Sequence, residues 1–258
     1  MASLSVPPVP TDPRRDAIDL HRAFKGFGCD ATAVTAILAH RDASQRALIR
    51  RHYAAVYHQD LLHRLAAELS GHHKRAVLLW VLDPASRDAA VLHQALNGDV
   101  TDMRAATEVV CSRTPSQLLV VRQAYLARFG GGGGGGPRAR RRRQGVRRPP
   151  EAASGVPALA AAVKSETSGN FGFGLLTILR CAESPAKYFA KVLHEAMKGL
   201  GTNDTTLIRV VTTRAEVDMQ YIKAEYHRSY KRSLADAVHS ETSGNYRTFL
   251  LSLIGRDR

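Results

Sequence analysis

The chain has 258 residues, of which 44% are hydrophobic and 23% are charged, and its formal net charge is +14. This composition is typical of a globular protein with one large or two small domains and excludes a chain that is disordered throughout. Three cysteines without a paired framework indicate a reducing compartment, no run approaches the roughly 18 apolar residues of a membrane span, and the first residues lack the apolar segment of a secretory signal, so we expect a cytoplasmic protein.

The first region of the chain with a clear pattern, residues 14–83, has a helical period. AVTAILAHR places Val34, Ile37 and Leu38 on one helical face, and LLHRLAAEL does the same with its leucines. Asp30 stands where a helix N-cap is expected. Alternation with period two is never sustained. We therefore predict an all-α fold with about five short helices in this region.

This pattern returns along the chain. Residues 25–82 align with 198–255 without a gap, so that KGFGCDATAVTAILAHR falls on KGLGTNDTTLIRVVTTR, and Asn203 takes the place of Asp30 as the N-cap. A partial copy, with Asp102 as its N-cap, occupies residues 87–129. The other half of a copy resumes in VKSETSGNFGFGLLTIL, which resembles VHSETSGNYRTFLLSLI near the C-terminus.

Residues 130–156 do not belong to the repeat. They contain a glycine run and seven arginines, and they cannot bury enough apolar surface to fold, so we predict a disordered linker. The remainder of the chain is moderately basic and favours an anionic partner, either nucleic acid or an acidic membrane, while half of the basic excess comes from the seven arginines of this segment. They are Arg138, Arg140, Arg141, Arg142, Arg143, Arg147 and Arg148.

A five-helix repeat of about 70 residues, with KGxGT in its first loop and a glutamate about 40 residues later, resembles the annexins. LLWVLDP and CAESPAKYFAKVLHEAMKGLGT resemble the plant branch of that family. Annexins have four repeats, so the resemblance implies that the back half of repeat two and the front half of repeat three are missing. The implied order is a tail (1–13), repeat one (14–83), the front of repeat two (87–129), the linker (130–156), the back of repeat three (157–181) and repeat four (185–256).

The glycine loops predict calcium sites. Ca²⁺ takes about six to eight oxygen ligands, and glycines allow consecutive carbonyls to converge because they accept positive φ. The expected ligands are three backbone carbonyls and one glutamate in each complete repeat: Phe24, Gly26, Gly28 and Glu68, and Met197, Gly199, Gly201 and Glu241. The fourth repeat fits better because Cys29 replaces Thr202 in the first. A plain helix-capping turn beside a solvated acid is the alternative.

Other readings of the glycine loops are weaker. In LNGDVTD, Val100 replaces the second glycine and the matching Glu166 lies beyond the linker, so we expect no calcium there. A nucleotide-phosphate loop is not expected either, because no strand precedes the glycines and the GxxxxGK[ST] spacing does not occur.

The resemblance implies a protein that is not an enzyme but binds acidic phospholipid such as phosphatidylserine when calcium rises. It would be cytoplasmic, with peripheral attachment to the plasma membrane, a role in stress responses, and homo-oligomers allowed on membranes. Two alternatives stay open: a haem peroxidase activity through His40, and non-specific binding of polyanions by the arginine tract. No specific nucleic acid is expected, because no aromatic residues interleave the arginines.

Two further sets of side chains have structural interpretations. Arg41, Arg113 and Arg214 occupy one repeated position, where we expect ion pairs or helix-end caps. Trp80 is expected to pack in the core rather than to insert into lipid.

Overall fold

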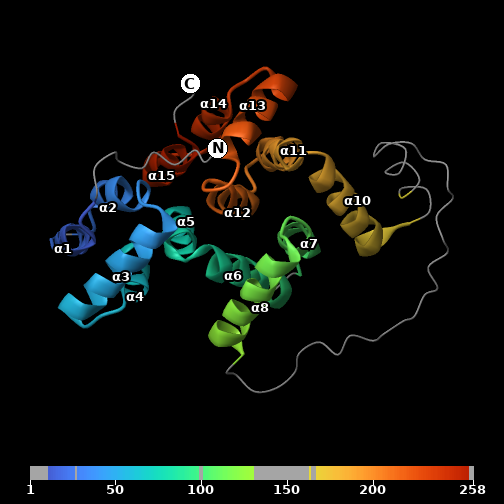
Figure 1. The fold of residues 1–258 in the computed structure, drawn as a ribbon. Helices are drawn as coiled ribbons and strands as arrows, with labels where there is room; N and C mark the ends of the chain where they lie inside the picture. Colours follow the sequence, from blue (N-terminus) through green and yellow to red (C-terminus); the bar gives the residue numbers. More distant parts are fainter. Residues whose placement is uncertain (1–10, 27, 99–100, 131–162, 164–166, 256–258) are drawn as a thin grey trace. The chain divides into compact units, whose positions relative to one another are not determined.

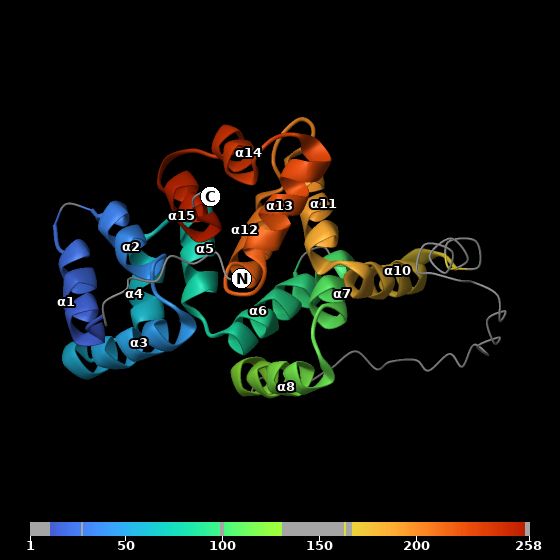
Figure 2. The ribbon, with the colours of Figure 1, turned by 45° about the horizontal axis from the view of Figure 1, so that its top comes forward.

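The structure, a computed structural model, describes residues 11–26, 28–98, 101–130, 163 and 167–255. Every regular element within these ranges is an α-helix, as Figure 1 and Figure 2 show. The all-α fold is therefore confirmed. Within the described ranges, no helix is long and apolar enough to cross a membrane. The helices fall into two compact units, one made of residues 1–90 and 185–258 and the other of residues 91–184.

The first repeat forms five helices: α1 (Pro13–Ala23), α2 (Ala31–Leu38), α3 (Ala43–Tyr57), α4 (Leu61–Glu68) and α5 (Gly71–Val81). Each of the first four follows an aspartate whose side chain accepts a hydrogen bond from a backbone N–H of the first turn. These N–H groups have no partner inside the helix, and each such cap contributes about 1 kcal/mol. Five helices and the Asp30 cap are as the sequence predicts.

The fourth repeat forms the same series: α11 (Pro185–Met197), α12 (Asp204–Arg214), α13 (Met219–Tyr230), α14 (Leu234–Glu241) and α15 (Gly244–Ile254). Asn203 caps α12, since its side chain accepts a hydrogen bond from the Thr206 N–H at 3.0 Å. Both complete repeats belong to the first unit, where α5 packs against α12 and α15, and α2 packs against α15. The core of this unit is therefore shared by two segments that are distant in sequence.

Trp80 lies in that core. Its side chain is fully buried, and its indole Nε1–H donates to the Leu38 carbonyl at 2.8 Å. A buried indole with a satisfied N–H is a packing residue. The prediction that Trp80 does not face lipid is confirmed.

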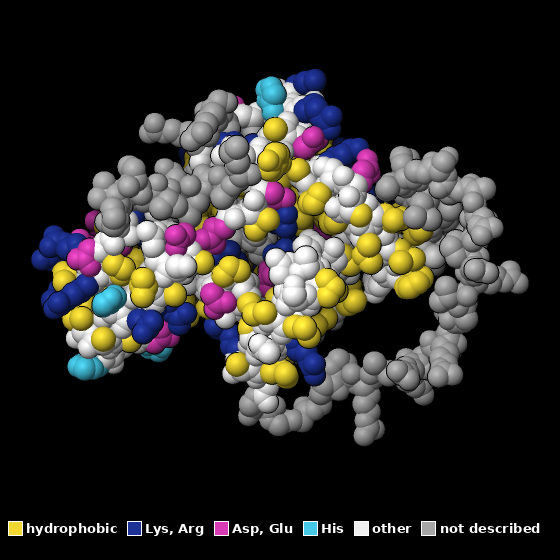
Figure 3. Space-filling model, viewed as in Figure 1, with side chains coloured by type: hydrophobic (Ala, Val, Ile, Leu, Met, Phe, Trp, Pro, Cys, Tyr) yellow, Lys and Arg dark blue, Asp and Glu magenta, His cyan; other side chains and the backbone are white. Residues whose placement is uncertain are grey.

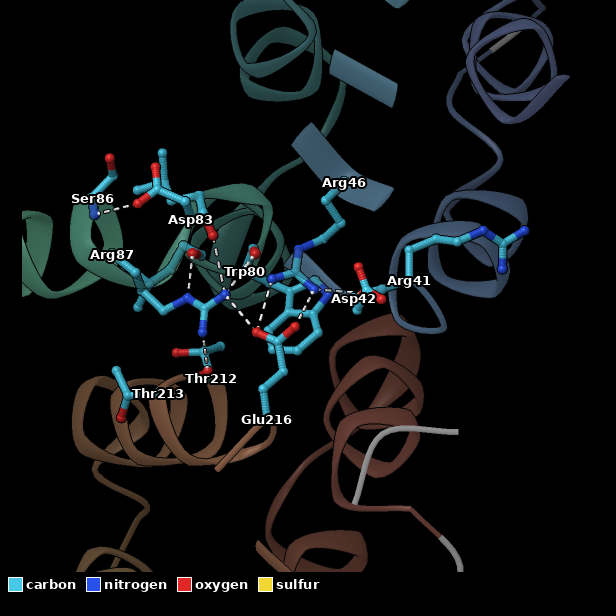
Figure 4. Close-up of polar contacts among 12 residues, drawn as sticks. Arg41, Asp42, Arg46, Trp80, Asp83, Ser86, Arg87, Thr212, Thr213 and Glu216 are labelled. Carbon is cyan, nitrogen blue, oxygen red and sulfur yellow. Dashed lines mark hydrogen bonds and ion pairs between the residues drawn. The ribbon is translucent and has the colours of Figure 1, made fainter. Parts of the chain in front are cut away.

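Two buried arginines meet one glutamate beside this tryptophan (Figure 4). Arg46 from α3 pairs with Glu216 at 3.0 Å, and Arg87, at the start of the sixth helix, approaches the same carboxylate at 3.4 Å. The guanidinium carbons of Arg46 and Arg87 lie 3.8 and 4.7 Å from the Trp80 ring centroid. Arg87 also donates to the Thr212 carbonyl at 2.7 Å. The cluster ties the first repeat to the fourth.

Two of the three repeated arginines form ion pairs, and the third donates hydrogen bonds beside a helix end. Arg41 holds Asp16 of α1 with two hydrogen bonds of 2.7 and 2.8 Å. Arg214, at the end of α12, is paired with Asp218 four residues later. Arg113 donates to the Ser112 hydroxyl at 3.0 Å, beside the end of the helix that precedes it. Their shared role is structural.

The second unit contains the end of α6 (Pro84–Asn97) together with α7 (Met103–Cys111), α8 (Pro115–Phe129) and α10 (Gly169–Glu183). Asp102 caps α7, as predicted, by accepting from the Ala105 N–H at 3.0 Å. α7 packs along α10, with the Arg104 guanidinium 5.4 Å from the Phe173 ring centroid. Two helices that lie on either side of residues 131–162 in the sequence therefore pack together in this unit.

Large apolar side chains of this unit face solvent on α8 and α10 (Figure 3). Leu119 is 61% exposed and Phe171 is 66% exposed. Such exposure is unusual for a helix face of a folded repeat, and it agrees with the absence of the half-repeats that would complete each copy.

Most of the predicted linker, residues 131–156, lies outside the described residues, as does Glu166. The linker and the boundaries of the half-repeats therefore stay predictions.

Candidate metal sites at the glycine loops

The loop of the fourth repeat connects α11 to α12, and its shape depends on two glycines. Gly199 has φ of 116° and Gly201 has φ of 91°, in the region that residues with a Cβ rarely adopt. A Cβ built on either glycine would meet no atom within 4 Å, so backbone conformation rather than space requires glycine here. The loop starts where the last carbonyls of α11 emerge, at the negative end of the helix dipole. This end of a helix favours a cation.

Glu241, the last residue of α14, lies at the same loop. The Thr202 hydroxyl donates to its carboxylate Oε2 at 2.9 Å and lies 3.4 Å from its backbone carbonyl. A glutamate that is 40 residues away in sequence is thus held against the glycines by a neutral donor. Among the described residues, no Lys, Arg or His forms an ion pair with Glu241. Its charge is available to a cation.

The donor set of this site suits calcium. Backbone carbonyls and one carboxylate are hard oxygen ligands, the type that Ca²⁺ prefers, whereas zinc is usually held by histidine and cysteine. Within the described residues, no group of three or more His, Cys, Asp or Glu side chains could hold a metal. The residues present in the fourth repeat, Met197, Gly199, Gly201 and Glu241, therefore fit calcium and not a cluster of side-chain ligands.

In its described residues, the loop of the first repeat shares two features with that of the fourth: positive φ at both glycines and a backbone hydrogen bond that spans the loop. Gly26 and Gly28 have φ of 134° and 97°, and the Asp30 N–H donates to the Ala23 carbonyl at 2.9 Å, as the Asn203 N–H does to the Ala196 carbonyl at 2.7 Å. The residue between the two glycines is not described. The two loops are thus built alike.

The surroundings of the first loop differ. Arg64, one turn before Glu68 on α4, lies with its Nη2 2.7 Å from the Glu68 Oε1 and donates from the same atom to the Phe24 carbonyl at 3.3 Å. Cys29 stands where the fourth repeat has Thr202, and burial, followed by the charges of Glu68 and Asp30, raises the pKa of its thiol. The Glu68 carboxylate and the Phe24 carbonyl therefore lie near each other, with the Arg64 guanidinium bound to both.

Sequence reasoning missed Arg64. A signal for it exists, because Arg64 and Glu68 have the i,i+4 spacing of a helical ion pair and the fourth repeat has Ala237 at the matching position.

His40, the candidate haem ligand, follows the end of α2 and is half-buried. Burial, followed by the charge of Arg41, lowers the pKa of its imidazole. A neutral imidazole can ligate iron, but haem also needs a closed apolar pocket with tuned neighbours. His40 is half exposed and so does not lie in a closed pocket. Its position therefore does not support the peroxidase alternative.

Comparisons with known proteins agree with this geometry. The annexin family model matches residues 15–80, 87–131 and 188–253. Annexin D5 of Arabidopsis thaliana is 41% identical over 313 aligned positions, which cover 99% of both chains. That alignment is longer than this 258-residue chain, so the relative has residues without a counterpart here, as the missing half-repeats require.

Solved structures show the same relationship. Annexin III has a TM-score of 0.86 at 26% identity, covering 100% of this chain and 98% of its own. Calcium-bound annexin (Sm)1 has a TM-score of 0.78 at 25% identity, covering 99% of this chain and 93% of its own. With the repeat, the glycine loops and these matches in agreement, the chain belongs to the annexin family.

Proposed function

We propose that this protein attaches peripherally to acidic phospholipid membranes when calcium rises, chiefly through the glycine loop of its fourth repeat. The carbonyls of Met197, Gly199 and Gly201 and the carboxylate of Glu241 would hold the ion. Bound Ca²⁺ would supply the positive charge that joins these oxygens to a lipid phosphate. The observation that carries the proposal is the hydrogen bond from Thr202 to Glu241, which fixes the carboxylate at the loop before any ion arrives.

A second feature of the loop supports contact with a membrane. Leu200, between the two glycines, is fully exposed at the tip of the loop. An exposed leucine between the two glycines could enter the boundary between headgroups and acyl chains when the loop meets a membrane. The proposed ion ligands Gly199 and Gly201 thus flank an exposed apolar side chain.

The first repeat carries the corresponding ligands Phe24, Gly26, Gly28 and Glu68, and we include it as a second, weaker calcium site. On this proposal the protein is not an enzyme. It would be cytoplasmic at resting calcium and would bind the acidic inner face of the plasma membrane when calcium rises. Assembly into homo-oligomers on the membrane is compatible with this function.

Co-sedimentation with vesicles tests the proposal. The protein should pellet with phosphatidylserine vesicles in calcium, return to the supernatant when a chelator is added, and stay in the supernatant with phosphatidylcholine vesicles. Pelleting that ignores both calcium and lipid charge would contradict it.

The arginine tract should add a second, calcium-independent attraction to acidic membranes. Each arginine near such a surface contributes about 1 kcal/mol, and this attraction is screened over a Debye length of about 8 Å at physiological ionic strength. We expect residual binding to phosphatidylserine vesicles in chelator that disappears as salt is raised, whereas binding in calcium persists because it depends on short-range coordination.

Deleting residues 130–156 tests whether the arginine tract causes the calcium-independent binding. The deletion should abolish the chelator-resistant fraction and leave the calcium-dependent fraction intact. If calcium-dependent binding is lost while the circular dichroism spectrum stays helical, the tract is part of the calcium-dependent membrane contact.

A further inference from the structure

In the first loop, the positively charged side chain of Arg64 contacts two of the proposed calcium ligands. The Arg64 Nη2 lies 2.7 Å from the Glu68 carboxylate and 3.3 Å from the Phe24 carbonyl oxygen. These are two of the four groups expected to bind calcium in this repeat. The guanidinium carbon is also 5.8 Å from the Phe24 ring centroid. Arg64 is therefore held at the loop by contacts with both the carboxylate and the residue whose carbonyl would face the ion.

The fourth repeat has no such group. Its residue at the position of Arg64 is Ala237, and its glutamate is held by the Thr202 hydroxyl at 2.9 Å. In the first repeat, the position of Thr202 is taken by Cys29. The two copies therefore hold equivalent carboxylates in different ways, one through a neutral hydroxyl and the other through a positive charge.

This difference acts directly on calcium affinity. An arginine side chain stays protonated throughout the physiological pH range. Both partners are largely shielded, since the side chains of Arg64 and Glu68 are 34% and 20% exposed, so their attraction is screened less than that of a fully exposed pair. A calcium ion at these oxygens must either displace the guanidinium or tolerate it nearby, and both cost binding free energy.

We propose that Arg64 is a tethered cation that occupies the ligands of the first loop and keeps its calcium affinity below that of the fourth. The inference rests on the proposed calcium-dependent function and concerns the regulation of one of its sites. The consequence is an ordered response: the fourth loop fills first, and the first loop fills only at higher calcium.

Replacing Arg64 with alanine, the residue of the fourth repeat, tests the inference. Calcium bound per chain is measured by equilibrium dialysis with phosphatidylserine vesicles, after subtraction of the calcium bound by vesicles alone. We expect the weaker of the two sites to tighten by about tenfold, the scale on which neighbouring groups alter metal affinity. Glu68→Gln added to Arg64→Ala should reverse this gain.

Arg51→Ala is the matched control, because Arg51 is exposed on α3 of the same repeat and its removal lowers the net charge equally. It should leave both sites unchanged. Arg64→Gln, which retains side-chain length without the charge, repeats the test if thermal melting shows that the alanine variant is destabilised.

Three results separate the outcomes. If Arg64→Ala and Arg64→Gln bind calcium as the wild type does, the inference is wrong and the proposed function stands. Weaker vesicle binding by these variants at saturating calcium would make Arg64 a contact for the lipid headgroup and would also overturn the inference. Wild-type protein that binds neither calcium nor acidic vesicles would instead refute the proposed function.

Discussion

Replacing Glu216 with alanine should lower the free energy of unfolding by about 3–5 kcal/mol, the usual cost of removing one partner of a buried ion pair. Arg46 is fully buried and Arg87 is 2% exposed, and both guanidinium groups pair with this carboxylate. The more distant charges of Asp42 and Asp83 on Arg46, and of Asp88 on Arg87, act more weakly than Glu216 does. Without it, two like charges would face each other beside Trp80. The variant is expected to unfold at markedly lower temperature and denaturant concentration.

The lowered pKa of Arg87 shows how much its burial disfavours the charged guanidinium. Burial, followed by the charge of Arg46, lowers the pKa of Arg87 to about 10, and Glu216 opposes that shift. Removing Glu216 takes away an opposing charge, so the pKa should fall further, yet the guanidinium stays charged near neutral pH. The charge must then be hydrated by opening the contact between the first and fourth repeats.

Urea denaturation monitored by circular dichroism measures this effect, with Glu195→Ala as the control. Glu195 forms a pair with Lys191 at 3.7 Å in which both side chains are more than half exposed, 53% and 58%. Exposed pairs contribute about 0–1 kcal/mol, so this variant should be nearly as stable as the wild type. Equal destabilisation by the two substitutions would show that the buried cluster does not join the repeats.

Replacing Glu241 with glutamine should raise the calcium concentration for half-maximal vesicle binding by tenfold or more. Glutamine preserves size and can still accept from Thr202, but it removes the negative charge and the bidentate carboxylate that complete the oxygen shell. Loss of a direct charged ligand should cost at least the roughly tenfold to hundredfold that is typical of groups around a metal's ligands. Folding should be unaffected, because Glu241 is only partly buried at the end of α14.

Glu225→Gln is the control for this prediction. Glu225 lies on α13 of the same repeat, pairs with Arg228, and is remote from the loop in sequence. Its substitution changes the net charge equally and should not alter the calcium requirement. A shift of similar size in both variants would mean that overall charge, rather than coordination by Glu241, governs binding.

Most helices and helix caps could be predicted from the sequence, because both depend on residues close together in the chain. The helical period identified the helices, and short polar side chains before the apolar runs identified the caps Asp30, Asp102 and Asn203, each confirmed by a hydrogen bond to a first-turn N–H. The repeat then placed each glycine loop beside its glutamate. Thr202 and Glu241 meet as that alignment requires.

Features that differ between the copies could not be found in this way. Arg46 and Glu216 align in the other repeat with Met219 and Ala43, so repetition gives no hint of the buried cluster. Its contacts join residues 170 positions apart, and no local rule specifies them. Arg64 differs again, since its helical spacing to Glu68 was visible, but its contact with the Phe24 carbonyl depends on how α4 packs against the first loop.

A calcium titration of binding to phosphatidylserine vesicles, with the wild type, Glu241→Gln and Glu68→Gln measured side by side, tests the central claim most directly. If the fourth loop carries the calcium-dependent contact, Glu241→Gln will shift the midpoint by tenfold or more, because it removes a charged ligand from an open site. Glu68→Gln will shift the midpoint little, because Arg64 already pairs with that carboxylate. Equal shifts, or a larger shift for Glu68→Gln, would contradict the account.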